Sequence, residues 1–95
     1  MFVVLLRFSS NKAKAGQFMQ GHNAWIKRGF DDGIFLLVGT LQPALGGGIV
    51  AHNTSLPELQ RRVNADPFVA EEVVSAEILE IAPSRIDERF KLILK

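Results

Sequence analysis

The stretch IFLLVGTLQPALGGGIVAH, residues 34–52, carries two apolar segments separated by a segment rich in glycine. Residues 34–38 form a short continuous apolar run, which is typical of a buried strand, and residues 48–52 predict a second, shorter strand. The segment between them, residues 39–48, holds one proline and four glycines. We therefore expect a loop there and a hairpin formed by the two strands.

One strand and one helix are predicted before this hairpin. Residues 2–8 (FVVLLRF) are apolar except for Arg7, a pattern typical of a strand that is covered on both faces. From residue 12 to about residue 31, apolar residues recur largely at steps of three or four, which predicts an amphipathic helix. The sequence Asp31-Asp32-Gly33 ends this helix with a turn.

A second helix is predicted after the hairpin. Thr54 or Ser55 is the expected N-cap, and Pro57 lies in the first turn, where its missing N–H costs nothing. The helical pattern ends near Ala65, and Asp66-Pro67 then predicts a turn.

The remaining residues complete the order of elements. Residues 68–72 are expected to form one helical turn, and residues 73–81 form the fourth strand. The C-terminal tail, residues 83–95, could be helical at residues 86–90 or extended at residues 90–94. The sequence pattern does not separate these two alternatives.

The predicted order is strand, helix, strand, strand, helix, strand. This βαββαβ pattern is that of the α+β ferredoxin-like fold, with an antiparallel sheet and both helices on one face. Because the strands are apolar on both faces, the second face also needs cover, and two sheets packed face to face supply it. We therefore predict a homodimer, which could assemble further. Residues 1–95 form one domain, with a core at about residues 1–82 and a tail at residues 83–95.

Composition excludes several classes of protein. The net charge is +1, with 11 basic and 10 acidic residues, so no basic field is available to hold a nucleic acid. No apolar run reaches the ~18 residues of a membrane span, and the first residues lack the basic start of a signal peptide. The absence of cysteine excludes disulfides and thiolate catalysis. We expect a cytoplasmic protein without membrane or nucleic-acid partners.

His22 is the first candidate for a functional side chain. It lies on the apolar stripe of the first helix. Phe18 and Met19 precede it by four and three residues, and Ile26 follows it by four. One interpretation is a buried structural histidine whose ring is hydrogen-bonded. The other is a general acid or base, because imidazole titrates near neutrality. The other histidine, His52, ends a predicted strand without clustered carboxylates nearby, so we predict no metal site.

Asp66 is the second candidate. An aspartate before proline commonly forms a turn and can cap the helical turn that follows. A carboxylate hydrogen-bonded to a buried imidazole would instead fix its tautomer and raise its basicity. In the predicted fold, the first helix and the end of the second lie on the same face of the sheet, so contact with His22 is allowed. Asp31 and Asp32 lie more than two helical turns beyond His22, too far for contact along one helix.

Further residues are candidates for contacts with a substrate. Arg7 is the lone charge in an apolar strand, where it could pair with a carboxylate or anchor an anionic substrate. Trp25 and Phe68 could wall a pocket, and Gln42 could supply a polar contact. The glycines at residues 46–48 precede neither a Lys-Ser/Thr pair nor a helix. A flexible hairpin connection, or a backbone close to a ligand, therefore fits better than a phosphate loop.

Taken in order, these features resemble the YciI-like (YCII-related) family. The resemblance rests on His22, the strand Gly33–Gly39, the glycine-bearing loop and the turn Asp66-Pro67-Phe68, and covers roughly residues 1–82. It implies a dimeric α/β-barrel made from two ferredoxin-like subunits, no cofactor, and a His–Asp pair as the active site. By position, His22 would be the acid or base and Asp66 its partner. One characterised kind of member is a dehydrochlorinase that acts on chlorinated hydroxyhydroquinone.

The chain departs from the family's pattern at two places, and two functional hypotheses follow. Thr40 follows Gly39, where the family commonly has proline, and residues 41–48 lack the acidic residue often found in that loop. The first hypothesis is a cofactor-free enzyme in which His22 and Asp66 move a proton on a small hydroxylated aromatic or lactone-like substrate, in an elimination, isomerisation or hydrolysis. The second is a non-catalytic module for small-molecule binding or dimerisation, which would explain the missing loop carboxylate.

Overall fold

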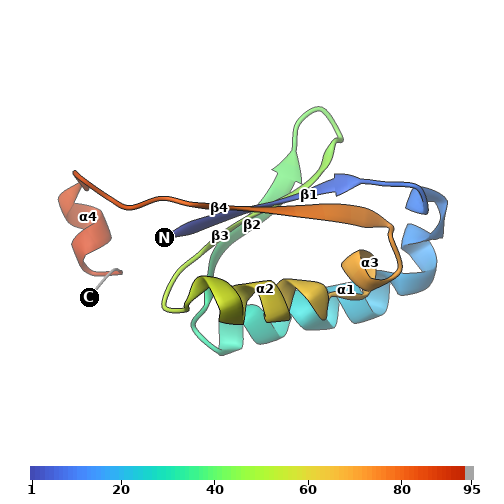
Figure 1. The fold of residues 1–95 in the computed structure, drawn as a ribbon, viewed down its shortest axis with the longest axis horizontal. Coiled ribbons are helices and arrows are strands. Elements are labelled where there is room, and N and C mark those ends of the chain that lie inside the picture. Colours follow the sequence, from blue (N-terminus) through green and yellow to red (C-terminus); the bar gives the residue numbers. More distant parts are fainter. Residues whose placement is uncertain (94–95) are drawn as a thin grey trace.

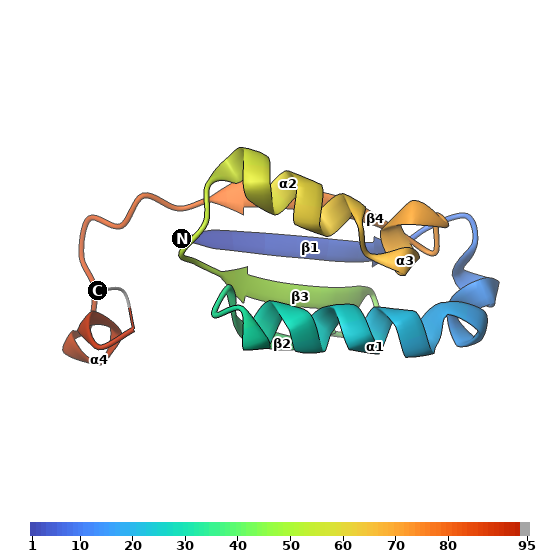
Figure 2. The same ribbon diagram turned by 90° about the horizontal axis from the view of Figure 1, so that it is seen from below.

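The computed structural model describes residues 1–93, and its architecture is the α+β ferredoxin-like fold that the sequence predicts. All neighbouring strands are antiparallel, in the order β2-β3-β1-β4. The strands are β1 (Phe2–Phe8), β2 (Phe35–Leu41), β3 (Gly46–Ala51) and β4 (Val74–Glu80). Two helices, α1 (Ala15–Asp31) and α2 (Leu56–Asn64), cover one face of this sheet, as Figures 1 and 2 show.

The β2–β3 hairpin differs from the expectation. The loop expected at residues 39–48 is wrong at both ends, because β2 continues to Leu41 and β3 begins at Gly46. The extra pairs include Gly39 with Gly48 and Leu41 with Gly46. A ladder of hydrogen bonds needs only backbone N–H and C=O groups, so glycines can extend a hairpin when the partner strand is in place.

Local signals set the ends of the two long helices. The Ser55 hydroxyl accepts a hydrogen bond from the Glu58 backbone N–H at 3.3 Å, so Ser55 rather than Thr54 is the N-cap of α2. Helix α1 begins later than residue 12, because Lys12–Lys14 form a single 3-10 turn, η1. The short helix α3 (Pro67–Ala70) occupies the place of the helical turn expected at residues 68–72.

The C-terminal segment leaves the body of the domain. β4 lies within the strand predicted at residues 73–81, and an irregular stretch then leads to α4 (Glu88–Lys91). The helical alternative therefore holds for part of the tail, while residue 94, the end of the extended alternative, lies outside the described residues. Figure 1 shows α4 standing apart from the sheet and from the other helices.

The hydrophobic core lies between the sheet and the helices. Side chains alternate along β1, so Phe2, Val4 and Leu6 are buried against the helices. Leu59 and Val63 of α2 are fully buried on the other side of this layer. The remaining core residues are Trp25, Ile34, Phe35, Ile49, Ala51, Phe68, Val73 and Val74.

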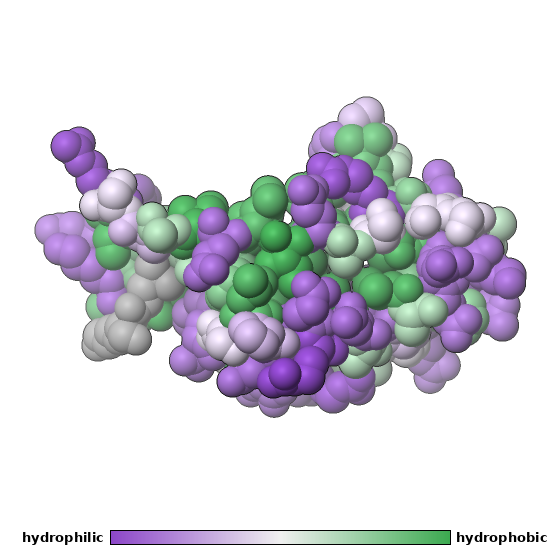
Figure 3. All heavy atoms as spheres, in the orientation of Figure 1, coloured by the Kyte–Doolittle hydropathy of each residue, from purple (hydrophilic) through white to green (hydrophobic). Residues whose placement is uncertain are grey.

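The opposite face of the sheet, called the outer face below, is also apolar. Val3 and Leu5 of β1 and Val50 of β3 lie on it and are half-buried. Leu37 of β2 and Leu79 of β4 pair with Val50 and Val3 and are 57% and 45% exposed. Figure 3 shows apolar side chains gathered over the strands, between the C-terminal segment and the hairpin. Within residues 1–93, no helix has the length and apolar character needed to cross a membrane.

Candidate active site

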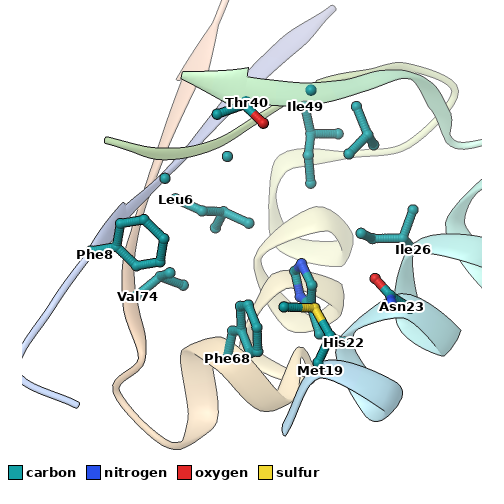
Figure 4. A pocket seen from close by; sticks show the side chains of 15 residues that line it. Leu6, Phe8, Met19, His22, Asn23, Ile26, Thr40, Ile49, Phe68 and Val74 are labelled. Atoms are coloured by element: carbon teal, nitrogen blue, oxygen red, sulfur yellow. The ribbon is translucent and has the colours of Figure 1, made fainter. Parts of the chain in front are cut away.

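His22 lies on the face of α1 that looks toward the sheet. Its side chain is only 13% exposed, and Figure 4 shows the ring projecting from α1 into a hollow beneath the strands. The ring stacks flat on Phe68 of α3, with centroids 3.9 Å apart and planes inclined by 4°. Packing against Phe68 thus restricts how the imidazole can turn.

Asp66 meets this imidazole from the other end of the sequence. It sits between α2 and α3, its side chain is completely buried, and its Oδ1 accepts a hydrogen bond from the Phe68 backbone N–H at 3.0 Å. The same Oδ1 lies 2.8 Å from His22 Nδ1. The two chain segments can approach because residue 21 is glycine: a Cβ there would lie 3.1 Å from Pro67 Cγ. The adjacent pairs Gly21-His22 and Asp66-Pro67 therefore pack directly against each other.

This contact determines which nitrogen of neutral His22 carries the proton. When Asp66 is ionised, its carboxylate can only accept hydrogen bonds, so the proton of a neutral His22 then lies on Nδ1. Nε2 then keeps its lone pair, and the hydrogen bond of the ring among residues 1–93 is the one at Nδ1. A nitrogen of this kind can take a proton from a ligand, and the carboxylate stabilises the imidazolium that results.

His22 is part of the wall of a cavity of about 290 Å³ between α1, α3 and the sheet. Most of the wall is apolar. Asn23 adds a polar side chain beside His22 on α1, and Thr40 adds one from β2, on the sheet side of the cavity. No lysine, arginine, aspartate or glutamate belongs to this wall within the part of the chain that the structure describes. The other lining residues are Leu6, Phe8, Met19, Ile26, Val38, Gly39, Gly46, Gly47, Gly48, Ile49, Phe68 and Val74.

One of the four expected substrate contacts lines the cavity, and three lie outside its wall. Phe68 lines the cavity, whereas Trp25 is buried, with its ring 6.0 Å from the imidazole and its Nε1 donating to the Arg62 carbonyl. Arg7 follows Leu6 in β1, so its side chain points to the outer face, where it pairs with Glu77 at 2.9 Å. Gln42 is exposed in the turn between β2 and β3, outside the cavity wall.

Met19, Asn23 and Thr40 are among the lining residues that the sequence did not single out. Met19 shares the apolar stripe of His22, and that spacing was a signal for it. Asn23 follows His22 directly and gave no signal of its own. Thr40 was assigned to a loop; a longer β2 would have placed it on the same face as Val38.

The other acidic and imidazole groups do not join this site. Asp31 pairs with Lys27 at 2.7 Å and Asp32 pairs with Arg62 at 2.8 Å, both in exposed positions. His52 lies at the end of β3, where its backbone N–H bonds to the Ile34 carbonyl. Among residues 1–93, no three His, Cys, Asp or Glu side chains converge so that they could hold a metal ion.

Comparison with known proteins shows the fold but not the family. No protein-family model matches the chain, and no curated protein matches it in sequence. Among solved structures, the fold is similar to that of 5-chloro-2-hydroxyhydroquinone dehydrochlorinase from Burkholderia phenoliruptrix AC1100, in complex with 2,5-dihydroxybenzoquinone, with a TM-score of 0.69. The similarity covers 86% of this chain and 94% of that enzyme, at 13% sequence identity.

Proposed function

We propose that this protein is a small cofactor-free enzyme of the YciI-like kind, in which His22 and Asp66 carry out acid–base chemistry. The observation that carries the proposal is the 2.8 Å contact between His22 Nδ1 and Asp66 Oδ1 at the wall of a cavity. The structural likeness to a dehydrochlorinase supports a small-molecule enzyme on this fold. The expected cytoplasmic location stays a prediction.

In the proposed mechanism, Nε2 of His22 takes a proton from a C–H or O–H group of the bound substrate. The electron pair stays on the substrate, and the carboxylate of Asp66 stabilises the imidazolium. If the proton returns to another carbon, the reaction is an isomerisation. If the electron pair expels a neighbouring group instead, the reaction is an elimination.

The proposed substrate is small, largely apolar and uncharged. The described wall of the cavity offers no permanently charged side chain that would pair with a carboxylate or phosphate. Phe68 and the strand residues would contact a ring, while Asn23 and Thr40 would bind hydroxyl or carbonyl oxygens. A hydroxylated aromatic or a lactone-like compound has these properties.

Replacement of His22 by Gln tests the catalytic role. Two assays are suitable: chloride release from 5-chloro-2-hydroxyhydroquinone and isomerisation of a small unsaturated lactone. We expect turnover to fall by about 10²–10⁴-fold, because a positioned acid–base group contributes that much. Circular dichroism and thermal unfolding should show a folded protein. Full turnover in the variant would contradict the assignment, and ligand binding without turnover in the wild type would favour the non-catalytic module.

We also propose that the protein is a homodimer formed through the outer face. Leu37 and Leu79 are large apolar residues on that face and are about half exposed. Together with the half-buried Val3, Leu5 and Val50 they form a contiguous apolar surface, of the kind that marks an interaction site. Two copies of the sheet can cover each other, because in a two-fold symmetric dimer the same surface patch of each subunit faces that of its partner.

A further inference from the structure

Three consecutive glycines of β3, Gly46, Gly47 and Gly48, form part of the cavity wall. A strand interior with three glycines is unusual, since glycine weakens a strand and supplies no side chain to pack.

The fold explains two of these glycines. Gly46 has φ of 137°, a conformation that disfavours residues with a Cβ, and a Cβ there would overlap the Leu6 carbonyl oxygen. At Gly48 the side-chain direction is toward the outer face, where a Cβ would lie 3.1 Å from Leu41 Cδ2. Neither position controls the space in front of His22.

Gly47 is different, because the fold leaves room for a side chain there. It pairs with Leu6 of β1 and Thr40 of β2, and Leu6 is buried on the helix side of the sheet. A Cβ at residue 47 would therefore point toward the helices, into the cavity that Leu6 and His22 line. It would touch only the Gly39 carbonyl oxygen, at an ordinary 3.6 Å, and Gly47 does not have a positive φ.

We propose that Gly47 determines specificity, because its missing side chain sets the size of the largest ligand that the cavity accepts. A cavity of roughly 150 Å³ is enough for benzene, so about 290 Å³ leaves room for more than a single ring. A side chain at residue 47 would occupy that additional space. The inference rests on the proposed function in that the cavity is taken as the substrate site, but it concerns binding and not catalysis.

Binding of phenol and of 2-naphthol to the ¹⁵N-labelled protein, followed through amide chemical shifts, tests the inference. In the wild type we expect both to bind, with shifts in β3 and α1. Gly47→Val should weaken 2-naphthol binding by about tenfold or more, since overfilling a pocket by a methyl-sized group already costs this much. Binding of phenol should change little. Gly47→Ala should give a smaller effect in the same direction.

Gly16→Ala is the control, because Gly16 lies in α1 outside the cavity wall and a Cβ there meets nothing within 4 Å. It should leave the affinities of both probes unchanged. Equal weakening of phenol and 2-naphthol by Gly47→Val, unchanged 2-naphthol binding, or no binding of either probe to the wild type would overturn the inference. So would unfolding of the Gly47→Ala variant, since glycine would then be required by the fold. Binding without turnover would refute only the proposed function.

Discussion

At the scale of single residues, Asp66 links the turn before α3 to the candidate site. Its Oδ1 accepts from the Phe68 N–H and lies 2.8 Å from His22 Nδ1, while its Oδ2 is buried without a partner among residues 1–93. The hydrogen bond from the Phe68 N–H therefore holds in place the same oxygen, Asp66 Oδ1, that orients the imidazole. Because Phe68 also stacks on His22, the turn positions both the partner of the ring and the surface on which the ring rests.

Asp66→Asn should destabilise the protein by about 1–3 kcal/mol, because no orientation of the amide satisfies all its groups. If the amide oxygen replaces Oδ1, the NH₂ group is buried at the position of Oδ2, which has no partner in the described chain. If the amide is flipped, the cap on Phe68 is lost. Urea unfolding monitored by Trp25 fluorescence measures this cost.

Asp31→Asn is the control for the same chemical change at an exposed position. Asp31 makes only a surface pair with Lys27, so the free energy of unfolding should change by less than about 0.5 kcal/mol. An Asp66→Asn variant as stable as the wild type would contradict the structural role of the buried carboxylate.

The ¹⁵N shifts of His22 should also show the proton on Nδ1 in the wild type.

Sequence reasoning could point to the two residues in contact at the candidate site, but not to all its walls. Helical spacing placed His22 toward the sheet, and the structural contact with Asp66 is one that the predicted fold allowed. Arg7 was chosen because it is a lone charge in an apolar strand, yet strand alternation sends it to the outer face. No periodic signal marks Asn23, since a neighbour of a buried helical residue is usually exposed.

At the scale of elements, the helices and strands were predicted in kind and order, while several of their ends differ from the prediction. Thr40 and Gly47 pair in the hairpin although glycine and proline nearby favour a loop. The register between β2 and β3 is a property of two strands together, and local propensity cannot express it. The same limit explains why Gly46 and Gly47, which form part of the cavity wall, were assigned to a loop.

Gly29→Ala should destabilise the packing of α1 on β2. Gly29 is buried, and a Cβ there would overlap the ring of Phe35. Because that ring is held in the core, we expect a loss of about 1–3 kcal/mol, the typical cost of overpacking. Gly16→Ala in the same helix meets nothing within 4 Å and should be neutral or slightly stabilising. Equal thermal midpoints for the two variants would contradict this account.

At the scale of the whole molecule, the sheet is covered on only one face within a single chain. The helices bury Val4 completely and Ile49 almost completely, whereas Leu37 and Leu79 on the outer face remain about half exposed. The C-terminal segment, which stands apart in Figure 1, adds Phe90 and other exposed apolar residues at one end. The helices thus account for the apolar residues on one face of β1, and the proposed second subunit would account for those on the other.

Leu37→Glu should convert the proposed dimer into a monomer. The side chain is 57% exposed, so the folded subunit loses little, but a dimer through the outer face would bury an unpaired carboxylate at a cost of several kcal/mol. Sedimentation at micromolar concentration should show a dimer for the wild type and a monomer for the variant. Leu56→Glu is the matched control, because Leu56 is 43% exposed at the start of α2, on the helix side of the sheet. A wild type that sediments as a monomer would refute the proposed dimer, and loss of the dimer in the Leu56 variant would refute the outer face as its interface.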